Sequence, residues 1–217
     1  MIKAIIFDMD GTLINSVPIW FHSARRLLAE CGSGLTLDEY KFWVGRDETG
    51  MIFSKIRETG KPKTKDWIRK RRAKIVSELL KDYRLKADPF LMRLMRLKDR
   101  GIKFGLATGT RRKTTRLFLK RLEIDKEFEC IISRDEVRRG KPSPDVYLKC
   151  SRCLRVIPSE CLAFEDSEAG VNSAKAAGMH CIAVPNRFTK HHDFSKADLI
   201  IWRRSKVGVK LVERWLK

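Results

Sequence analysis

Residues 5–13 read Ile-Ile-Phe-Asp-Met-Asp-Gly-Thr-Leu, an apolar run that ends abruptly in two carboxylates, Asp8 and Asp10, followed by a Gly-Thr pair. An apolar run followed by a turn predicts a buried strand whose carboxyl end carries both acids. Open α/β sheets bind their ligands at the carboxyl ends of the strands. Because two close carboxylates in different surroundings can hold different protonation states, one can act as a nucleophile and the other as a proton donor.

The rest of the chain repeats a strand-and-helix rhythm. Strand-like runs cover residues 2–7, 102–107, 130–133, 161–164, 181–184 and 199–202. Helical patterns cover residues 113–122, 144–154, 169–177 and 206–216. Strands that alternate with helices predict a mostly parallel sheet covered on both faces, so we expect a Rossmann-like three-layer α/β core.

One segment between residues 15 and 86 breaks this rhythm. It has no convincing strand, and its apolar residues favour helices over 19–31, 37–43, 49–59 and 65–81. The simplest interpretation is an all-helical insertion packed over the carboxyl end of the sheet. We therefore expect a catalytic core made of residues 1–15 and 87–217 and a helical cap domain made of residues 16–86. The connections at residues 16–18 and 86–89 would be the hinges.

Three further motifs follow the first in order. They are Leu-Ala-Thr-Gly-Thr at residues 106–110, Gly-Lys-Pro-Ser-Pro-Asp at 140–145 and Ala-Phe-Glu-Asp-Ser-Glu-Ala-Gly at 163–170. Together with the Asp-Met-Asp-Gly-Thr of residues 8–12, they resemble the four motifs of the haloacid dehalogenase (HAD) superfamily of phosphohydrolases, over nearly the whole chain. Within it, the helical insertion is similar to the cap of the β-phosphoglucomutase and phosphoglycolate phosphatase group.

The resemblance implies phosphoryl transfer through an aspartyl-phosphate. Asp8 would attack phosphorus, and Asp10 would protonate the leaving oxygen and later activate water. The Thr108 hydroxyl and the Gly109 amide would donate to the phosphate. Lys141 would supply a fixed positive charge between Asp8 and the transferring group.

The resemblance also implies a Mg²⁺ site, because the phosphate and Asp8 are both anionic and their repulsion must be relieved. Its ligands would be Asp8, the backbone carbonyl of Asp10, Glu165 and Asp166, of which Asp166 is the stronger candidate. Oxygen ligands of this kind suit a hard cation. The acids at 165 and 166 also suit the start of a helix, where the dipole favours negative charge, and the two interpretations are compatible.

Substrate choice would come from the cap. Arg46 falls where relatives place a substrate-specificity loop, and it could meet an anionic or polyol group. Trp20 stands where the sugar-phosphate mutases of the family often carry a histidine near the leaving group, a departure that argues against mutase activity. We expect a phosphatase acting on a small phosphate monoester, such as a sugar phosphate or phosphoglycolate. A β-phosphoglucomutase-type mutase is the alternative, since it shares every core residue.

The chain is strongly basic, with 47 Lys and Arg against 27 Asp and Glu and a formal charge of +20. Such a field attracts anions, including phosphate esters and nucleic acids. The predicted helix at 65–81 is itself strongly basic. We interpret it as a solvated amphipathic helix, with a polyanion-binding face as the alternative. A nucleic-acid-binding protein without catalysis is therefore a third hypothesis, which the intact catalytic set argues against.

Other features bear on the environment of the protein. No apolar run approaches the roughly 20 residues that a bilayer span needs. The sequence begins at once with a strand and two functional acids, so we expect no signal peptide, a cytoplasmic location and a monomer. Cys150 and Cys153 form a Cys-x-x-Cys pair, but no second pair or nearby histidine completes a zinc set. We expect the six cysteines to be free thiols.

Overall fold

Residues 1–215 are described by the computed structural model. They divide into two compact units. The core unit contains Met1–Asn15 and the chain from Lys86 onward, and the helical unit contains Ser16–Leu85. At the junction, Asn15 and Lys86 bind each other twice: the Asn15 amide donates to the Lys86 carbonyl, and the Lys86 amide donates to Asn15 Oδ1 at 2.6 Å. None of the helices among the described residues is long and apolar enough to span a membrane.

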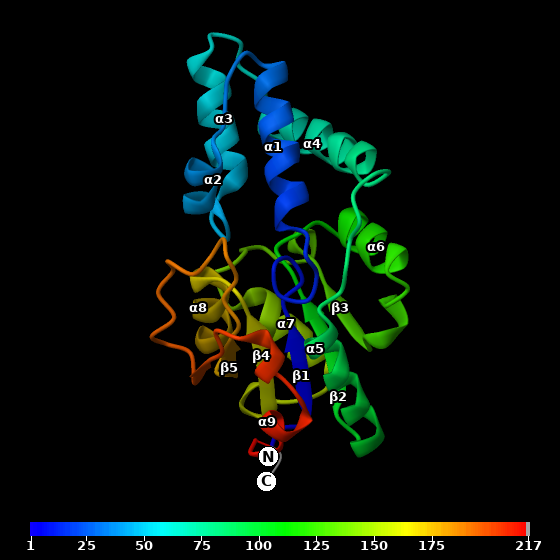
Figure 1. The fold of residues 1–217 in the computed structure, drawn as a ribbon. Coiled ribbons are helices and arrows are strands. Elements are labelled where there is room, and N and C mark those ends of the chain that lie inside the picture. Colours follow the sequence, from blue (N-terminus) through cyan, green and yellow to red (C-terminus); the bar gives the residue numbers. More distant parts are fainter. Residues whose placement is uncertain (216–217) are drawn as a thin grey trace. The chain divides into compact units, whose positions relative to one another are not determined.

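The core unit contains one parallel sheet of six strands in the order β3-β2-β1-β4-β5-β6 (Figure 1). The strands are β1 (Ala4–Phe7), β2 (Lys103–Ala107), β3 (Cys130–Ile132), β4 (Cys161–Glu165), β5 (His180–Ala183) and β6 (Leu199–Ile200). Each observed strand overlaps a predicted strand. This confirms the α/β fold with a helical insertion after the first strand. Every residue of β1 is buried, as expected of a central parallel strand that is covered on both faces.

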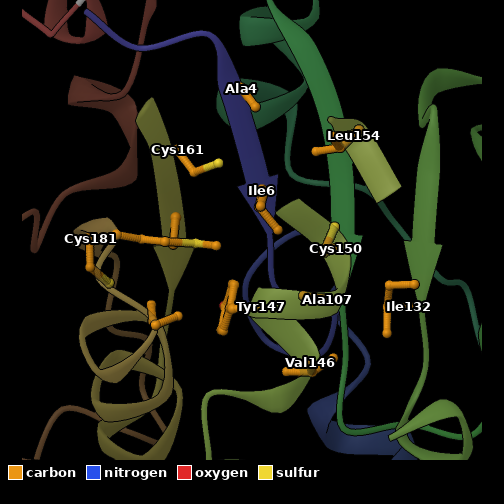
Figure 2. Close-up of a cluster of buried hydrophobic side chains, with 14 of the residues drawn as sticks. Ala4, Ile6, Ala107, Ile132, Val146, Tyr147, Cys150, Leu154, Cys161 and Cys181 are labelled. Atoms are coloured by element: carbon orange, nitrogen blue, oxygen red, sulfur yellow. The ribbon is translucent and has the colours of Figure 1, made fainter. Parts of the chain in front are cut away.

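Two helices cover one face of the sheet, α7 (Asp145–Leu154) and α8 (Glu168–Ala176). Their apolar residues form a buried cluster with alternate residues of the strands. Figure 2 shows this cluster, in which α7 contributes Val146, Tyr147, Cys150 and Leu154. Because successive strand residues point to opposite faces, Ala4 and Ile6 of β1 belong to this cluster. The other residues of β1 point to the opposite face.

Phenylalanines dominate that opposite face. The ring of Phe7 packs against Phe104, Phe128 and Phe164, with centroids 5.4–6.5 Å apart. A 3₁₀ helix, η1 (Arg93–Arg100), contacts β2 and α9 (Val209–Glu213). The other helical segments of the core unit are α5 (Pro89–Met92), α6 (Arg112–Arg121), η2 (Asp125–Glu127), η3 (Arg134–Glu136), η4 (Pro158–Glu160) and η5 (Arg204–Lys206).

Two predictions at the ends of this unit need correction. The helical stretch over residues 89–100 was not predicted, although its buried residues Leu91, Leu94, Met95 and Leu97 follow helical spacing. The predicted helix over 206–216 is shorter than expected: residues 204–206 form a 3₁₀ turn and the α-helix ends at Glu213. Leu216, the last residue of that prediction, lies outside the described residues.

The helical unit contains the four predicted helices: α1 (Val17–Glu30), α2 (Leu37–Trp43), α3 (Glu48–Glu58) and α4 (Lys65–Leu79). Local capping explains where three of them start. Thr36 forms a capping box with Glu39 at the start of α2, and Asp47 and Thr64 accept backbone N–H groups at the starts of α3 and α4. Such caps satisfy amides that have no partner inside the helix.

The basic run of α4 is not a uniformly solvated face. Arg72 is 8% exposed, and its guanidinium pairs with Glu48 at 2.5 Å and donates to the Trp20 carbonyl at 3.1 Å. The Arg71 guanidinium forms a bidentate pair with the Glu30 carboxylate. These pairings neutralise part of the charge that the sequence alone assigned to a solvated face, and Arg72 instead joins α4 to α1 and α3.

The expectation of six free thiols is wrong for one pair. Cys130 of β3 and Cys153 of α7 form a disulfide with their Cα atoms 6.1 Å apart. Cys150, the other half of the Cys-x-x-Cys pair, stays a buried free thiol, as do Cys161 and Cys181 of the core unit and Cys31 of the helical unit. Since residues 150 and 153 lie on one helix, the bridge reaches the neighbouring strand and not the nearer cysteine in the sequence.

Candidate active site

The register of the sheet gathers the motif residues at one edge. Phe7, the last residue of β1, pairs with Leu106 of β2 and with Phe164 of β4. The residues that follow these positions therefore leave the sheet side by side. Asp8 continues the pairing, since its amide donates to the Phe164 carbonyl at 2.9 Å. This is the carboxyl edge, where the sequence placed the two acids.

Lys141 lies at the centre of this edge. Its ammonium donates to Asp8 Oδ1 at 2.6 Å, to Glu165 Oε1 at 2.6 Å and to the Ala107 carbonyl at 2.9 Å. Burial acts to lower the pKa of Lys141, but the charges of Asp8 and Glu165 outweigh it, and the pKa is raised above its ordinary value. The lysine is therefore a fixed cation at neutral pH, held by three oxygen atoms.

Asp10 is held by the second motif. Its Oδ2 accepts the Thr110 hydroxyl at 2.7 Å and the Thr108 hydroxyl at 3.3 Å, and Thr108 Oγ1 accepts the Thr110 amide. Thr108, predicted as a phosphate donor, is thus also a neighbour of Asp10. The role of Thr110 was not predicted, although its place in the Thr-Gly-Thr sequence is a signal that could have identified it.

Asp8, Glu165 and Asp166 form a compact buried acidic group. One carboxylate oxygen of each lies within 4.8 Å of the others. Burial is the main cause that raises the pKa of Asp8 well above its usual range, and burial followed by the charge of Glu165 raises the pKa of Asp166 to about 7. Three buried carboxylates at this spacing are costly without positive charge. The group has the hard oxygen donors that suit a divalent cation.

Glu165 is the most enclosed of the three, with no exposed surface. Its Oε1 accepts the Tyr147 hydroxyl at 2.7 Å as well as the Lys141 ammonium, and its Oε2 accepts the Ser167 hydroxyl at 3.4 Å. A Cβ atom on Gly170 would collide with its carboxylate, so only glycine lets the first turn of α8 come this close. Tyr147 was not predicted, and its position six residues after Lys141 is the one signal that the sequence offers.

The Asp166 carboxylate accepts hydrogen bonds from two side chains. Thr12 donates to its Oδ1 at 3.3 Å and Asn186 donates to its Oδ2 at 2.5 Å. Asn186 also donates to the Gly11 carbonyl, which accepts a second hydrogen bond from the Arg204 guanidinium. Neither Asn186 nor Arg204 was predicted, since both lie beyond the four motifs.

Gly109 and the residues of the helical unit complete the predicted set. A Cβ atom on Gly109 would meet nothing within 4 Å, so open space lies beside this backbone. In the helical unit, the Trp20 ring lies against the Arg72 guanidinium, 4.9 Å from its centroid. Arg46 lies over the ring of Phe42 at 4.3 Å. The contributions of Trp20 and Arg46 to substrate binding stay predictions, as do the catalytic roles of the core residues.

Comparison with known proteins places this geometry in a family. The family model of haloacid dehalogenase-like hydrolases matches residues 5–184. The phosphorylated carbohydrates phosphatase of Thermotoga maritima is 31% identical over 185 residues, which are 83% of each chain. The β-phosphoglucomutase of Bacillus subtilis is 30% identical over 229 residues, covering 98% of this chain and 95% of that protein.

Solved structures agree with this placement. The crystal structure of CbbY from Rhodobacter sphaeroides in complex with phosphate has a TM-score of 0.85 and 25% identity, covering 98% of this chain and 100% of that one. A second structure of CbbY from the same organism, a mutant in complex with xylulose-1,5-bisphosphate, has a TM-score of 0.83. With its parallel sheet, its helical insertion and a family match over most of its length, this chain is an enzyme that belongs to the haloacid dehalogenase-like hydrolases.

Proposed function

We propose that the protein is a Mg²⁺-dependent phosphatase that hydrolyses a small phosphorylated sugar or a similar phosphate monoester. One observation carries the proposal: at the carboxyl edge of the sheet, the Lys141 ammonium binds both Asp8 and Glu165, and these two acids form a group with Asp166 that could hold a metal ion. This arrangement places a carboxylate nucleophile beside a fixed cation, the Lys141 ammonium, and beside oxygen ligands for a second cation, the metal ion.

The proposed chemistry has two steps. A carboxylate oxygen of Asp8 forms a bond to phosphorus while the bond from phosphorus to the ester oxygen breaks, and protonated Asp10 gives its proton to that oxygen. The product alcohol leaves and Asp8 carries the phosphoryl group. Asp10, now a carboxylate, takes a proton from a water molecule whose oxygen forms a bond to phosphorus. The bond between phosphorus and the Asp8 oxygen breaks at the same time, which releases inorganic phosphate and restores the Asp8 carboxylate.

The surrounding residues fit these steps. Lys141 acts against the burial that raises the pKa of Asp8 and so favours its ionised form, and its positive charge balances the charge of the phosphoryl oxygens. The Thr110 hydroxyl orients Asp10. Gly109 leaves open backbone where a phosphate oxygen can approach. Mg²⁺, held by Asp8, Asp166 and the Asp10 carbonyl with Glu165 nearby, would offset the repulsion between Asp8 and the phosphate.

The substrate class rests on the relatives and on the helical unit. The relatives named above act on phosphorylated carbohydrates, as their names state, and one CbbY structure contains a sugar bisphosphate. We assign residues 16–85 to a cap that selects the alcohol part of the ester, with Arg46 and Trp20 as its candidate contacts. A tryptophan at position 20 offers no acid or base to a sugar hydroxyl, which favours hydrolysis over mutase chemistry.

The test is a panel of phosphate monoesters assayed for release of inorganic phosphate in MgCl₂. We expect hydrolysis of sugar phosphates, its loss in EDTA and its return with Mg²⁺. Asp8→Asn should lower kcat by about a thousandfold or more, since losing a covalent nucleophile typically costs that much. Asp99→Asn, on an exposed residue, is the matched control. Conversion of one sugar phosphate isomer into another without phosphate release would identify a mutase, and activity that persists in Asp8→Asn would exclude the proposed chemistry.

A further inference from the structure

Arg204 joins four oxygen atoms that belong to three separate segments of the core unit. Its Nη1 donates to the Thr12 carbonyl at 2.7 Å and to Asp88 Oδ2 at 3.0 Å. Its Nη2 donates to the Gly11 carbonyl at 2.5 Å and to the Val184 carbonyl at 2.9 Å. The side chain is 22% exposed. A guanidinium with so many backbone acceptors is bound as a structural cross-link, since its planar fork fixes the direction of each bond.

The turn that Arg204 binds leads directly to the acidic group. Gly11 has a φ of 82°, which allows the tight turn after Asp10. Thr12 in that turn donates to Asp166, and Asn186 connects Asp166 back to the Gly11 carbonyl. The carbonyls of the turn, the carboxylate of Asp166 and the end of β5 are therefore parts of one hydrogen-bond network that Arg204 closes.

We propose that Arg204 is a positioning residue for the cation site: it fixes the Gly11–Thr12 turn so that Asp166 and the Asp10 backbone keep their places around the metal. Asp88 balances the charge of the guanidinium and holds it in place, so that the arginine supplies donors without leaving an unpaired cation beside the site. The inference rests on the proposed function, which supplies the metal.

Two effects of Arg204 on a metal are separable. As a positioning residue it strengthens metal binding, because residues behind the ligands hold them in the binding geometry. As a nearby positive charge it weakens metal binding by repulsion. Replacing the arginine by glutamine removes both effects, whereas lysine keeps the charge and loses the fork. The sign of the change in the glutamine variant therefore tells which effect is larger.

The experiment titrates MgCl₂ into the EDTA-treated, substrate-free protein by calorimetry, with melting curves to check folding. We expect Arg204→Gln to weaken Mg²⁺ binding roughly tenfold, the size usual for residues that orient metal ligands. Arg204→Lys should weaken it at least as much, because lysine loses the fork and keeps the repulsion. Arg203→Gln, at the exposed neighbouring arginine, removes the same charge and should leave Mg²⁺ affinity unchanged. In MgCl₂ that saturates each variant, kcat of Arg204→Gln should still be reduced, because the turn also carries Asp10.

Tighter Mg²⁺ binding in Arg204→Gln would overturn the inference in favour of simple repulsion. A lower melting temperature with unchanged Mg²⁺ affinity would overturn it in favour of a purely structural role. If Arg204→Gln does not fold, Arg204→Lys tests the fork alone: weaker Mg²⁺ binding supports the inference, and unchanged Mg²⁺ affinity overturns it. A wild-type protein that binds Mg²⁺ but hydrolyses no ester would refute the proposed function and leave the positioning role standing, while wild-type activity with unaltered variants would refute the positioning role alone.

Discussion

Lys141 and Asp8 form a buried ion pair in which Nζ lies 2.6 Å from Oδ1 and each side chain is only 10% exposed. The two residues are 133 positions apart in the sequence. Lys141 is also the cation for Glu165, so one ammonium balances two buried carboxylates. This shared cation explains how the free protein can keep three acids together at the edge of the sheet.

Lys141→Met should destabilise the core unit by about 3–5 kcal/mol at pH 8, because it leaves two buried carboxylates without their partner. Urea unfolding of wild type and variant measures this difference. The loss should shrink at pH 5.5. Burial already raises the pKa of Asp8, and removing the lysine raises it further above its value in the unfolded chain. The folded variant therefore takes up a proton as the pH falls, and the cost of the unpaired charge is lost. Lys120→Met, at an exposed position of α6, is the control, and a cost that does not vary with pH would contradict the ion-pair account.

Tyr147→Phe keeps the ring that packs in the buried cluster (Figure 2). It removes the hydroxyl that donates to Glu165. We expect a stability loss of about 1 kcal/mol, since Glu165 keeps Lys141 as a donor. We also expect kcat to fall about tenfold, the lower end of what losing a group that orients a metal ligand produces.

Tyr40→Phe is the matched control for that variant. It removes a similar tyrosine–glutamate bond, to Glu48 at 3.1 Å, inside the helical unit. It should lower the melting temperature comparably and leave kcat unchanged. Wild-type kcat in Tyr147→Phe would show that Lys141 alone orients Glu165.

The disulfide between Cys130 and Cys153 should stabilise the oxidised protein. Its cysteines are 23 residues apart, and closing a loop of that length in the unfolded chain is worth about 3 kcal/mol. We expect a reductant to lower the melting temperature of wild type. The double variant with serine at both positions should melt at the lower temperature and should not respond to reductant. A wild-type protein whose intact mass shows six free thiols without reductant would refute the pairing.

Glu39 should make the helical unit sensitive to acid. Hydrogen bonds from Thr36, followed by the contact with Lys55, lower the pKa of Glu39 from an ordinary value near 4.5 to about 2. A carboxyl with a lowered pKa in the folded state stabilises that state fully above pH 4.5. This stabilisation is lost progressively as the pH falls toward 2.

Glu39→Gln tests this because glutamine can keep the capping box but cannot ionise. The variant should melt below wild type at pH 6, and the gap should narrow steadily between pH 4.5 and pH 2.5. A gap of constant size across that range would mean that the charge of Glu39 does not contribute. Asp38→Asn, at the exposed neighbour that pairs with Lys41, provides the comparison for a solvated acid.

The amino-acid sequence by itself determined most of the elements and the identity of the central acids. The apolar run before Asp8 predicts a buried strand, and the spacing of apolar residues predicts the helices of the insertion, because both signals are periodic over a few residues. The motifs around Thr108, Lys141 and Asp166 can also be recognised from a few consecutive residues. Helix starts such as Thr36 and Thr64 are equally local, since a cap needs only the three residues that follow it.

The tertiary structure alone decided which side chains meet. Arg204 reaches Gly11 across 193 positions, Tyr147 reaches Glu165, and Cys153 bonds to Cys130 and not to its neighbour in the Cys-x-x-Cys pair. The burial of Arg72 likewise depends on α1 and α3 packing against α4. None of these contacts leaves a pattern within a short stretch of sequence. They follow from the order of the parallel strands and from the packing of helices on the sheet and on one another. Both bring together residues that are far apart along the chain.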